Sequence, residues 1–213
     1  MNKQEELIKV AEEINRCRKC SLWQQATKAV PGEGSFDAKV IFVGEAPGFH
    51  EDQKGIPFCG AAGKLLDKLL VLARLKRDDV FITNVLKHRP PGNRDPSFEE
   101  IEACRSFLDR QIEIIDPKII VTLGRFSMVK FLPNVLISQV HGQPRFAQWG
   151  ERELIVLPMY HPAAALRNGK IMVEEQRDFR KLGAFLEKLE GKEKIEIKKE
   201  EKTKDKEQLK FSI

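Results

Sequence analysis

The sequence lacks any long apolar run, and its first residues lack the pattern of a secreted protein. No stretch approaches the roughly 18 uncharged apolar residues of a membrane-spanning helix. Charged residues interrupt the first ten residues, MNKQEELIKV, so they do not form the apolar core of a signal peptide. We therefore expect an intracellular, cytoplasmic protein with no membrane partner.

Three familiar motifs are also absent or incomplete. The chain has no G-x-x-x-x-G-K-[ST] phosphate loop and no H-x-E motif of the zinc deaminases. The segment Gly32-Glu33-Gly34 follows no predicted strand and lacks the third glycine of the dinucleotide fingerprint. These absences argue against phosphate-loop chemistry, zinc-dependent deamination and dinucleotide binding.

The composition favours a globular protein with an anionic partner. The chain has 213 residues, of which 41% are hydrophobic, which is enough for a buried core. Lysine and arginine total 37 against 32 acidic residues, so the formal net charge is +5. This charge suits nucleic-acid binding, although many basic proteins bind none. The charged fraction of 32% is typical of proteins from thermophilic prokaryotes.

Short β-branched runs alternate with longer helical patterns over the first 190 residues. The runs predict strands at 39–43, 80–83, 118–123 and 153–157. Helical spacing of apolar residues predicts helices near 3–16, 62–74, 98–115, 125–132 and 171–189. This alternation predicts an α/β fold with three α/β/α layers around a central, mostly parallel four-stranded sheet.

The chain divides into one folded domain, residues 1–190, and a charged tail, residues 191–213. The tail has eight lysines, six acidic residues and few apolar side chains, so we expect it to be flexible or marginally helical. Its last six residues faintly resemble peptides that dock on sliding clamps, but they lack the usual aromatic pair. A solvated tail on a monomeric protein is the favoured interpretation, and a sliding clamp is the alternative partner.

The four cysteines are Cys17, Cys20, Cys59 and Cys104, and a cytosolic setting disfavours disulfides between them. The spacing of Cys17 and Cys20 is that of a metal or cluster chelate. A redox pair and coincidence are the alternatives. Cys104 lies on the apolar side of the predicted helix 98–115, so taken alone it indicates a buried core thiol.

Four segments follow the predicted strands, and they are where a ligand is expected, because parallel sheets bind ligands beyond the carboxyl ends of their strands. All four are rich in glycine, proline and polar residues: 44–52, 84–96, 124–127 and 160–168. They contain the motifs GEAPG (44–48), TNVLKHRPPGNRDP (83–96) and HPAAAL (161–166), and GIPF (55–58) leads into GAAGKLL (60–66).

With the C-x-x-C motif upstream, these motifs together resemble the iron–sulfur, family-four uracil-DNA glycosylases, from about residue 14 to about residue 187. The resemblance implies a nucleoid-associated DNA repair enzyme that hydrolyses the N-glycosidic bond of uracil in single- or double-stranded DNA. Such an enzyme is monofunctional and leaves an abasic site for base excision repair. The alternative is a catalytically altered, metal-containing DNA-binding protein.

The resemblance also assigns roles in a uracil pocket. Phe58 matches the aromatic residue that stacks on the flipped base, and Asn84 matches the amide that reads the edge of uracil. His161 matches the donor that stabilises the departing uracil anion. Glu45, Ala46 and Pro47 form the other wall of the substrate-binding site. Ala46 stands where other glycosylases place an aspartate, so Glu45 is the expected catalytic substitute, with Glu51 as the second candidate.

The family loop usually reads K-C-R-P-P, whereas this chain has His88 in place of the cysteine. The resemblance therefore implies a [4Fe–4S] cluster bound by Cys17, Cys20, His88 and Cys104. A Cys₃His zinc site is the alternative. Loop cations beside the pocket are expected to hold DNA phosphates, and Leu166 is expected to fill the gap left by the base. The candidate DNA-binding residues are thus Lys87, Arg89, Arg94, Leu166 and Arg167.

Overall fold

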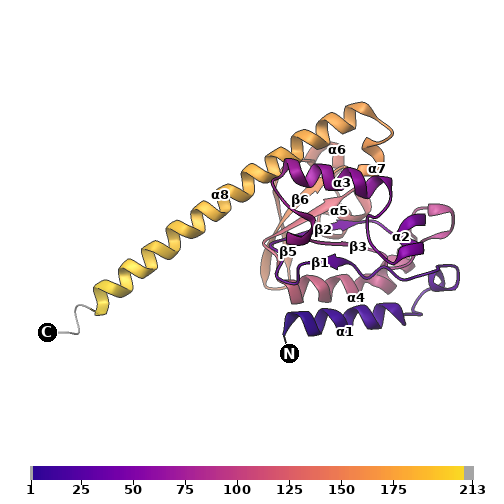
Figure 1. Ribbon diagram of the computed structural model, residues 1–213, viewed down its shortest axis with the longest axis horizontal. Helices are drawn as coiled ribbons and strands as arrows, with labels where there is room; N and C mark the ends of the chain where they lie inside the picture. Colours follow the sequence, from indigo (N-terminus) through magenta and orange to yellow (C-terminus); the bar gives the residue numbers. More distant parts are fainter. Residues whose placement is uncertain (1, 209–213) are drawn as a thin grey trace.

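The computed structural model describes the backbone of residues 2–208 and the side chains of residues 2–189 (Figure 1). Its sheet has six strands in the order β1-β3-β2-β4-β6-β5. The four central strands run parallel, and β1 and β5 pair antiparallel at the two edges. The strands are β1 (Glu33–Gly34), β2 (Val40–Gly44), β3 (Phe81–Asn84), β4 (Ile119–Leu123), β5 (Arg145–Trp149) and β6 (Arg152–Met159).

The four-stranded parallel core is confirmed, and the prediction missed the two edge strands. β1 spans only Glu33–Gly34, too short to show a periodic pattern. β5, with the sequence RFAQW, buries only its central alanine, so it has no continuous apolar run. Edge strands pair on one side only, which leaves them free to carry polar residues that a central strand excludes.

Helices cover both faces of the sheet, as the three-layer prediction requires. Residues of β2 alternate between two buried clusters, because successive strand side chains point to opposite faces. One cluster is completed by α3 (Ala61–Leu72) and α8 (Gly169–Gln208), and the other by α4 (Phe98–Ile115) and α5 (Arg125–Phe131). Helix α1 (Lys3–Asn15) packs outside α4 (Figure 1).

Short helices occupy many of the connections between the longer elements. They are η1 (Ser21–Gln24), α2 (Phe49–Lys54), η2 (Arg77–Asp79), η3 (Pro91–Asn93), α6 (Ile137–Val140) and α7 (Pro162–Ala165). Helix α4 follows the loop after β3 and begins with the capping box of Ser97 and Glu100, whose two reciprocal hydrogen bonds both form. This box fixes where the loop after β3 ends.

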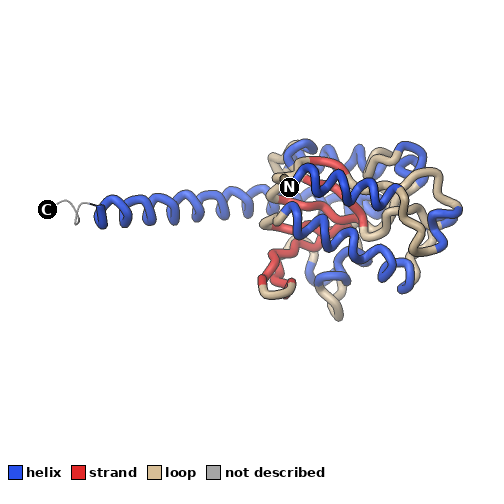
Figure 2. Tube along the Cα trace, turned by 90° about the horizontal axis from the view of Figure 1, so that it is seen from below, coloured by secondary structure: helices blue, strands red, loops and turns tan. Residues whose placement is uncertain are grey.

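Helix α8 continues to Gln208, so the tail is helical over most of its length and extends beyond the body of the domain (Figure 2). The clamp-like peptide lies outside the described residues except for Gln208. Within residues 2–208, no helix is both long and apolar enough to cross a membrane.

Candidate uracil-binding pocket and cysteine corner

A pocket of about 350 Å³ opens at the carboxyl ends of the central strands. It gathers all six residues predicted to bind the substrate, which come from β2, β3, β6 and the loops that follow them. These six are Glu45, Ala46, Pro47, Phe58, Asn84 and His161. Arg94 and Arg167 also line it, so two of the predicted DNA contacts lie at the pocket itself.

Asn84 is the last residue of β3, and its side chain is almost fully buried at the pocket. Its Oδ1 atom is shielded from solvent and has no hydrogen-bond partner among the described residues. A buried acceptor without a partner costs about 1–3 kcal/mol. Gly44 leaves room for this atom, because a Cβ there would lie 2.3 Å from Oδ1. The pocket therefore offers a buried acceptor to a ligand that carries an N–H donor.

His161 follows β6 and is the N-cap residue of α7. Its Nδ1 atom accepts a hydrogen bond from the backbone N–H of Ala163 at 3.1 Å, so in the neutral ring the proton is on Nε2. Burial in the pocket wall lowers the pKa of the imidazole to about 4. Gly124, with φ +95°, allows close packing, because a Cβ there would lie 3.2 Å from the His161 Cβ. His161 is thus a neutral Nε2–H donor at neutral pH.

Phe58 forms the wall beside His161. The two rings are stacked with their centroids 5.5 Å apart and their planes 26° apart. The backbone of Phe58 has φ +49°, in the left-handed region that few residues with a Cβ adopt. The backbone of Phe58 also requires a glycine at position 63, since a Cβ there would lie 1.6 Å from the Phe58 carbonyl oxygen. The ring is therefore held by an unusual backbone conformation and close packing.

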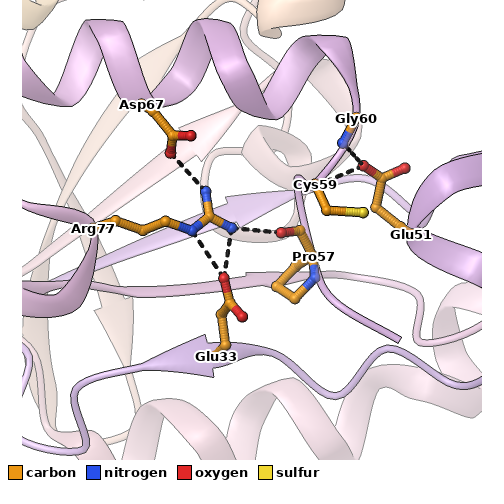
Figure 3. Close-up of polar contacts among 7 residues, drawn as sticks. All are labelled: Glu33, Glu51, Pro57, Cys59, Gly60, Asp67 and Arg77. Carbon is orange, nitrogen blue, oxygen red and sulfur yellow. Dashed lines mark hydrogen bonds and ion pairs between the residues drawn. The ribbon is translucent and has the colours of Figure 1, made fainter. Parts of the chain in front are cut away.

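The two candidate catalytic carboxylates differ in their surroundings. Glu45 is half-buried, and burial raises its pKa, with Asp95 adding to the effect and Arg125 opposing it. Glu51 is bound to the backbone, because its Oε1 atom accepts from the N–H groups of Cys59 at 2.9 Å and Gly60 at 2.8 Å (Figure 3). The pKa of Glu45 is thus raised in the pocket, whereas Glu51 is engaged in holding a turn.

The predicted metal ligands converge in one region, which we call the cysteine corner: Cys17, Cys20, His88 and Cys104. Cys20 packs against the buried Cys104, and His88 lines a cavity together with Cys17. Burial raises the pKa of the Cys104 thiol, and the neighbouring Lys87 opposes this shift. Cys59 lies instead at the turn held by Glu51. One imidazole and three thiols thus form the donor set of this corner.

The chemistry of this donor set suits a bound metal group. Thiolates and imidazole are ligands both of zinc and of iron–sulfur clusters. Among the described residues, no three His, Cys, Asp or Glu side chains are arranged to hold a single metal ion. By their chemistry, the residues present fit either group.

The prediction that Lys87 contacts DNA is wrong. Its side chain is fully buried, and its Nζ donates to Thr83 Oγ1 at 2.6 Å, Asn84 O at 2.8 Å and Gln111 Oε1 at 2.8 Å. Burial also lowers the pKa of this ammonium group to about 7. Lysine is rarely buried unless paired, and here three acceptors from β3 and α4 supply the pairing. Lys87 supports the end of β3 instead of facing DNA.

The remaining DNA-contact candidates lie at the surface. Arg94 and Arg167 are exposed, and Leu166 is 49% exposed. Arg94 pairs with Glu100, so part of its charge is already compensated. Arg89 is half-buried, and its Nε donates to Asn93 Oδ1 at 2.7 Å. These four residues stay predicted DNA contacts.

The chain is similar to known proteins over most of its length. Residues 31–189 match the family model of the uracil DNA glycosylase superfamily. A type-4 uracil-DNA glycosylase of Sulfurisphaera tokodaii is 52% identical over 183 residues, which cover 83% of this chain and 83% of that protein. The type-4 enzyme of Archaeoglobus fulgidus is 48% identical over 186 residues, covering 84% and 92%. That of Thermotoga maritima is 42% identical over 196 residues, covering 88% and 99%.

Proposed function

The chain belongs to the uracil DNA glycosylase superfamily, and from this we propose that it removes uracil from DNA. The reaction is hydrolysis of the bond between uracil N1 and the deoxyribose C1′, which leaves an abasic site. One observation carries the proposal: the unpartnered Asn84 Oδ1 lines the same pocket as the neutral His161. An acceptor and a donor so placed suit a base that carries both an N–H and carbonyl oxygens.

Asn84 selects uracil by its hydrogen bonds, and Phe58 holds the base without selecting it. The Oδ1 atom accepts the N3–H of uracil, and the amide nitrogen donates to O4. Cytosine presents the opposite pair at these positions, so it leaves the Asn84 amide mismatched. Stacking on Phe58 contributes about 1–3 kcal/mol for any base. The base must first leave the helix, which costs a few kcal/mol in a duplex.

His161 stabilises the leaving group as the bond breaks. The electron pair of the C1′–N1 bond moves onto uracil, and the Nε2–H of His161 donates to O2 as negative charge develops there. A donor placed at a developing anion typically accelerates a reaction by about 10²–10³-fold. The sugar passes through an oxocarbenium-like state that water then attacks. Glu45 accepts the proton of this water, which its raised pKa favours.

We also propose that Cys17, Cys20, His88 and Cys104 hold a [4Fe–4S] cluster. When bound, this group would cross-link the segment after α1 to the loop after β3 and to α4; its role is structural. Imidazole can ligate cluster iron, as in the [2Fe–2S] Rieske centres, where it raises the potential. Absorption near 400 nm with matching iron and sulfide content would support the cluster. A colourless protein with stoichiometric zinc would contradict it.

The DNA lies across the pocket mouth in this proposal. Arg89, Arg94 and Arg167 bind phosphates on either side of the flipped nucleotide, and Leu166 enters the gap left in the stack. Binding is then salt-sensitive and largely independent of sequence. Residues 1–190 form the catalytic unit of a monomer, and residues 191–213 form a separate tail.

The test is release of free uracil from oligonucleotides by the metal-loaded protein. We expect release from both single- and double-stranded DNA that contains uracil, and no strand cleavage. Protein that binds these oligonucleotides but releases no base would contradict the proposal. That result would indicate a DNA-binding protein that has lost catalysis.

A further inference from the structure

The turn at residues 57–60, which we call the stacking turn, carries Phe58 in a conformation that needs outside support. A residue with φ +49° persists only where its surroundings hold it there. Phe58 is also the residue whose ring must lie flat against the base in the proposed reaction. The contacts that hold the stacking turn therefore bear directly on substrate binding.

Arg77 contacts this turn at Pro57 and is not among the residues that line the pocket (Figure 3). It lies on η2, between α3 and β3, and its Nη2 donates to the Pro57 carbonyl oxygen at 2.6 Å. The same guanidinium donates to Glu33 Oε1 from Nε at 2.9 Å and from Nη2 at 2.7 Å. Its Nη1 donates to Asp67 Oδ1 at 2.9 Å. One planar group thus joins β1, α3 and the stacking turn.

Glu51 holds the other end of the same turn. Its carboxylate accepts the backbone N–H groups of Cys59 and Gly60, at the N-terminus of α3 (Figure 3). The peptide groups on both sides of Phe58 are therefore bound to charged side chains. Glu51 lines the pocket, whereas Arg77 does not. An effect of Arg77 on the base has to pass through the stacking turn.

We propose that Arg77 is a positioning residue for the base, fixing the stacking turn through the Pro57 carbonyl while Glu33 and Asp67 fix its guanidinium. The inference rests on the proposed function. The guanidinium fork is required, because a lysine ammonium is a single point and cannot serve the carbonyl and both carboxylates with the same geometry. Without the guanidinium, the stacking turn is no longer held in its conformation, and the ring of Phe58 moves out of its stacking position against uracil.

The first measurement compares Arg77→Lys and Arg77→Gln with wild type in uracil release. We expect kcat/KM to fall about 10–100-fold, since small displacements of a binding group have effects of this size. Affinity for DNA that contains an abasic site should change less than about 2-fold, because such DNA has no base to stack. Affinity for free uracil, measured by calorimetry, should fall with kcat/KM.

The control is Arg110→Gln, which removes a surface ion pair between α4 and Glu13 of α1, away from the pocket. It lowers stability in the same general way but should leave uracil release and uracil affinity unchanged. A loss of release by Arg77→Gln no larger than that of Arg110→Gln would overturn the proposal.

A double-variant cycle separates positioning from general destabilisation. In a Phe58→Leu background, Arg77→Lys should lower uracil release by less than about 2-fold further, because the ring it positions is absent. Full additivity of the two effects would contradict the inference even if each single variant is impaired. Wild type that releases no uracil would instead contradict the proposed function. In that case the calorimetric affinity for free uracil still tests the role of Arg77, because that measurement needs no catalysis.

Discussion

The uracil pocket and the cysteine corner are neighbours that are built in different ways. Ala46 of the pocket wall packs against the cluster that contains Cys20 and Cys104. In the pocket, the chain's own groups hold two of the functional side chains: Ala163 orients His161, and Arg77 supports the turn of Phe58. The pocket is therefore organised before any ligand binds.

The cysteine corner lacks comparable support. Cys17 and Cys20 are half-exposed, and Cys20 begins η1 without a side-chain cap. No three donors among the described residues form an ion site. Where a binding site is not preformed, the free energy of binding contributes to folding. The pocket thus depends on local packing, whereas the stability of the corner would depend on the cluster that we propose it holds.

The largest expected effect comes from filling the space that the pocket keeps open. Gly44→Ala would place a Cβ 2.3 Å from Asn84 Oδ1 and 2.7 Å from the Phe58 ring. Both groups that bind the base must then move, so we expect uracil release to fall about 10³-fold. Gly169→Ala is the matched control, because a Cβ there meets nothing within 4 Å. Equal activity of the two variants in single-turnover assays would refute the preorganised pocket.

Loss of the leaving-group donor should have the next largest effect. We expect His161→Ala to lower the rate of uracil release by about 10²–10³-fold at saturating DNA. The exposed His50, changed to Ala, is the control. A drop in DNA affinity without a drop in rate would mean that His161 only positions the substrate.

The lowered pKa of His161 also predicts how the free energy of unfolding depends on pH. Its pKa in the folded chain, about 4, lies below its ordinary value of 6.5. The unfolded chain therefore binds a proton first, and the free energy of unfolding falls as the pH drops from 6.5 towards 4. In denaturant titrations, the free energy of unfolding should fall more steeply with decreasing pH for wild type than for His161→Ala in this window, and the two pH curves should run parallel above pH 7.

If the corner holds the proposed cluster, removing it should affect the corner more than the pocket. We expect chelation to lower the free energy of unfolding by about 2–4 kcal/mol, as for loss of a ligand present well above its dissociation constant. Hydrogen exchange should rise first in residues 16–26 and 85–104. Cys104→Ser should lose the metal, whereas Cys59→Ser should retain it. Retention of iron by Cys104→Ser would show that the ligand set is wrong.

A smaller effect is expected at a buried acid that neither region uses. Glu175 is fully buried, its carboxyl oxygens have no partner among the described residues, and burial raises its pKa to about 8, with Asp178 adding to the shift. The folded chain then holds a proton that the unfolded chain releases above pH 4.5, so stability falls as the pH rises from 4.5 to 8.

Glu175→Gln should remove this dependence and stabilise the protein by about 1–3 kcal/mol at pH 8, with little effect at pH 4.5. The exposed Glu151, changed to Gln, is the control. Thermal unfolding of Glu175→Gln that follows the wild-type pH curve would show that Glu175 is ionised in the folded chain.

The smallest effect concerns the pocket rim. Arg167→Ala should weaken DNA binding uniformly across sequences and reduce the slope of log affinity against log salt by about 1. Lys87→Met serves as the contrast, since a buried lysine cannot release counterions from DNA. It should lower stability and leave the salt slope unchanged. A reduced slope for Lys87→Met would contradict the buried position.

Much of the fold could be predicted because it depends on local patterns. The four central strands are short β-branched runs, and the start of α4 follows from the spacing of Ser97 and Glu100. The edge strand β5 could not be found, because its polar residues are tolerated only by its position in the sheet.

The site was predictable in its residues but not in its chemistry. The motifs identified Phe58, Asn84 and His161, and the structure brings them together. The neutral state of His161 depends on a distance to Ala163 and on burial, neither of which appears in a sequence. Arg77 was missed and Lys87 misplaced for a common reason: their hydrogen-bond partners lie far away in the chain, up to 44 residues for Arg77 and 56 for Lys87.

The most direct test of the uracil pocket is single-turnover release of base from two oligonucleotides that differ only by uracil or cytosine at one position. Wild type should release uracil and no cytosine. Asn84→Ala should release little uracil while it still binds DNA with an abasic site. Equal release of both bases, or an Asn84→Ala variant as active as wild type, would show that the pocket does not read its substrate through this amide.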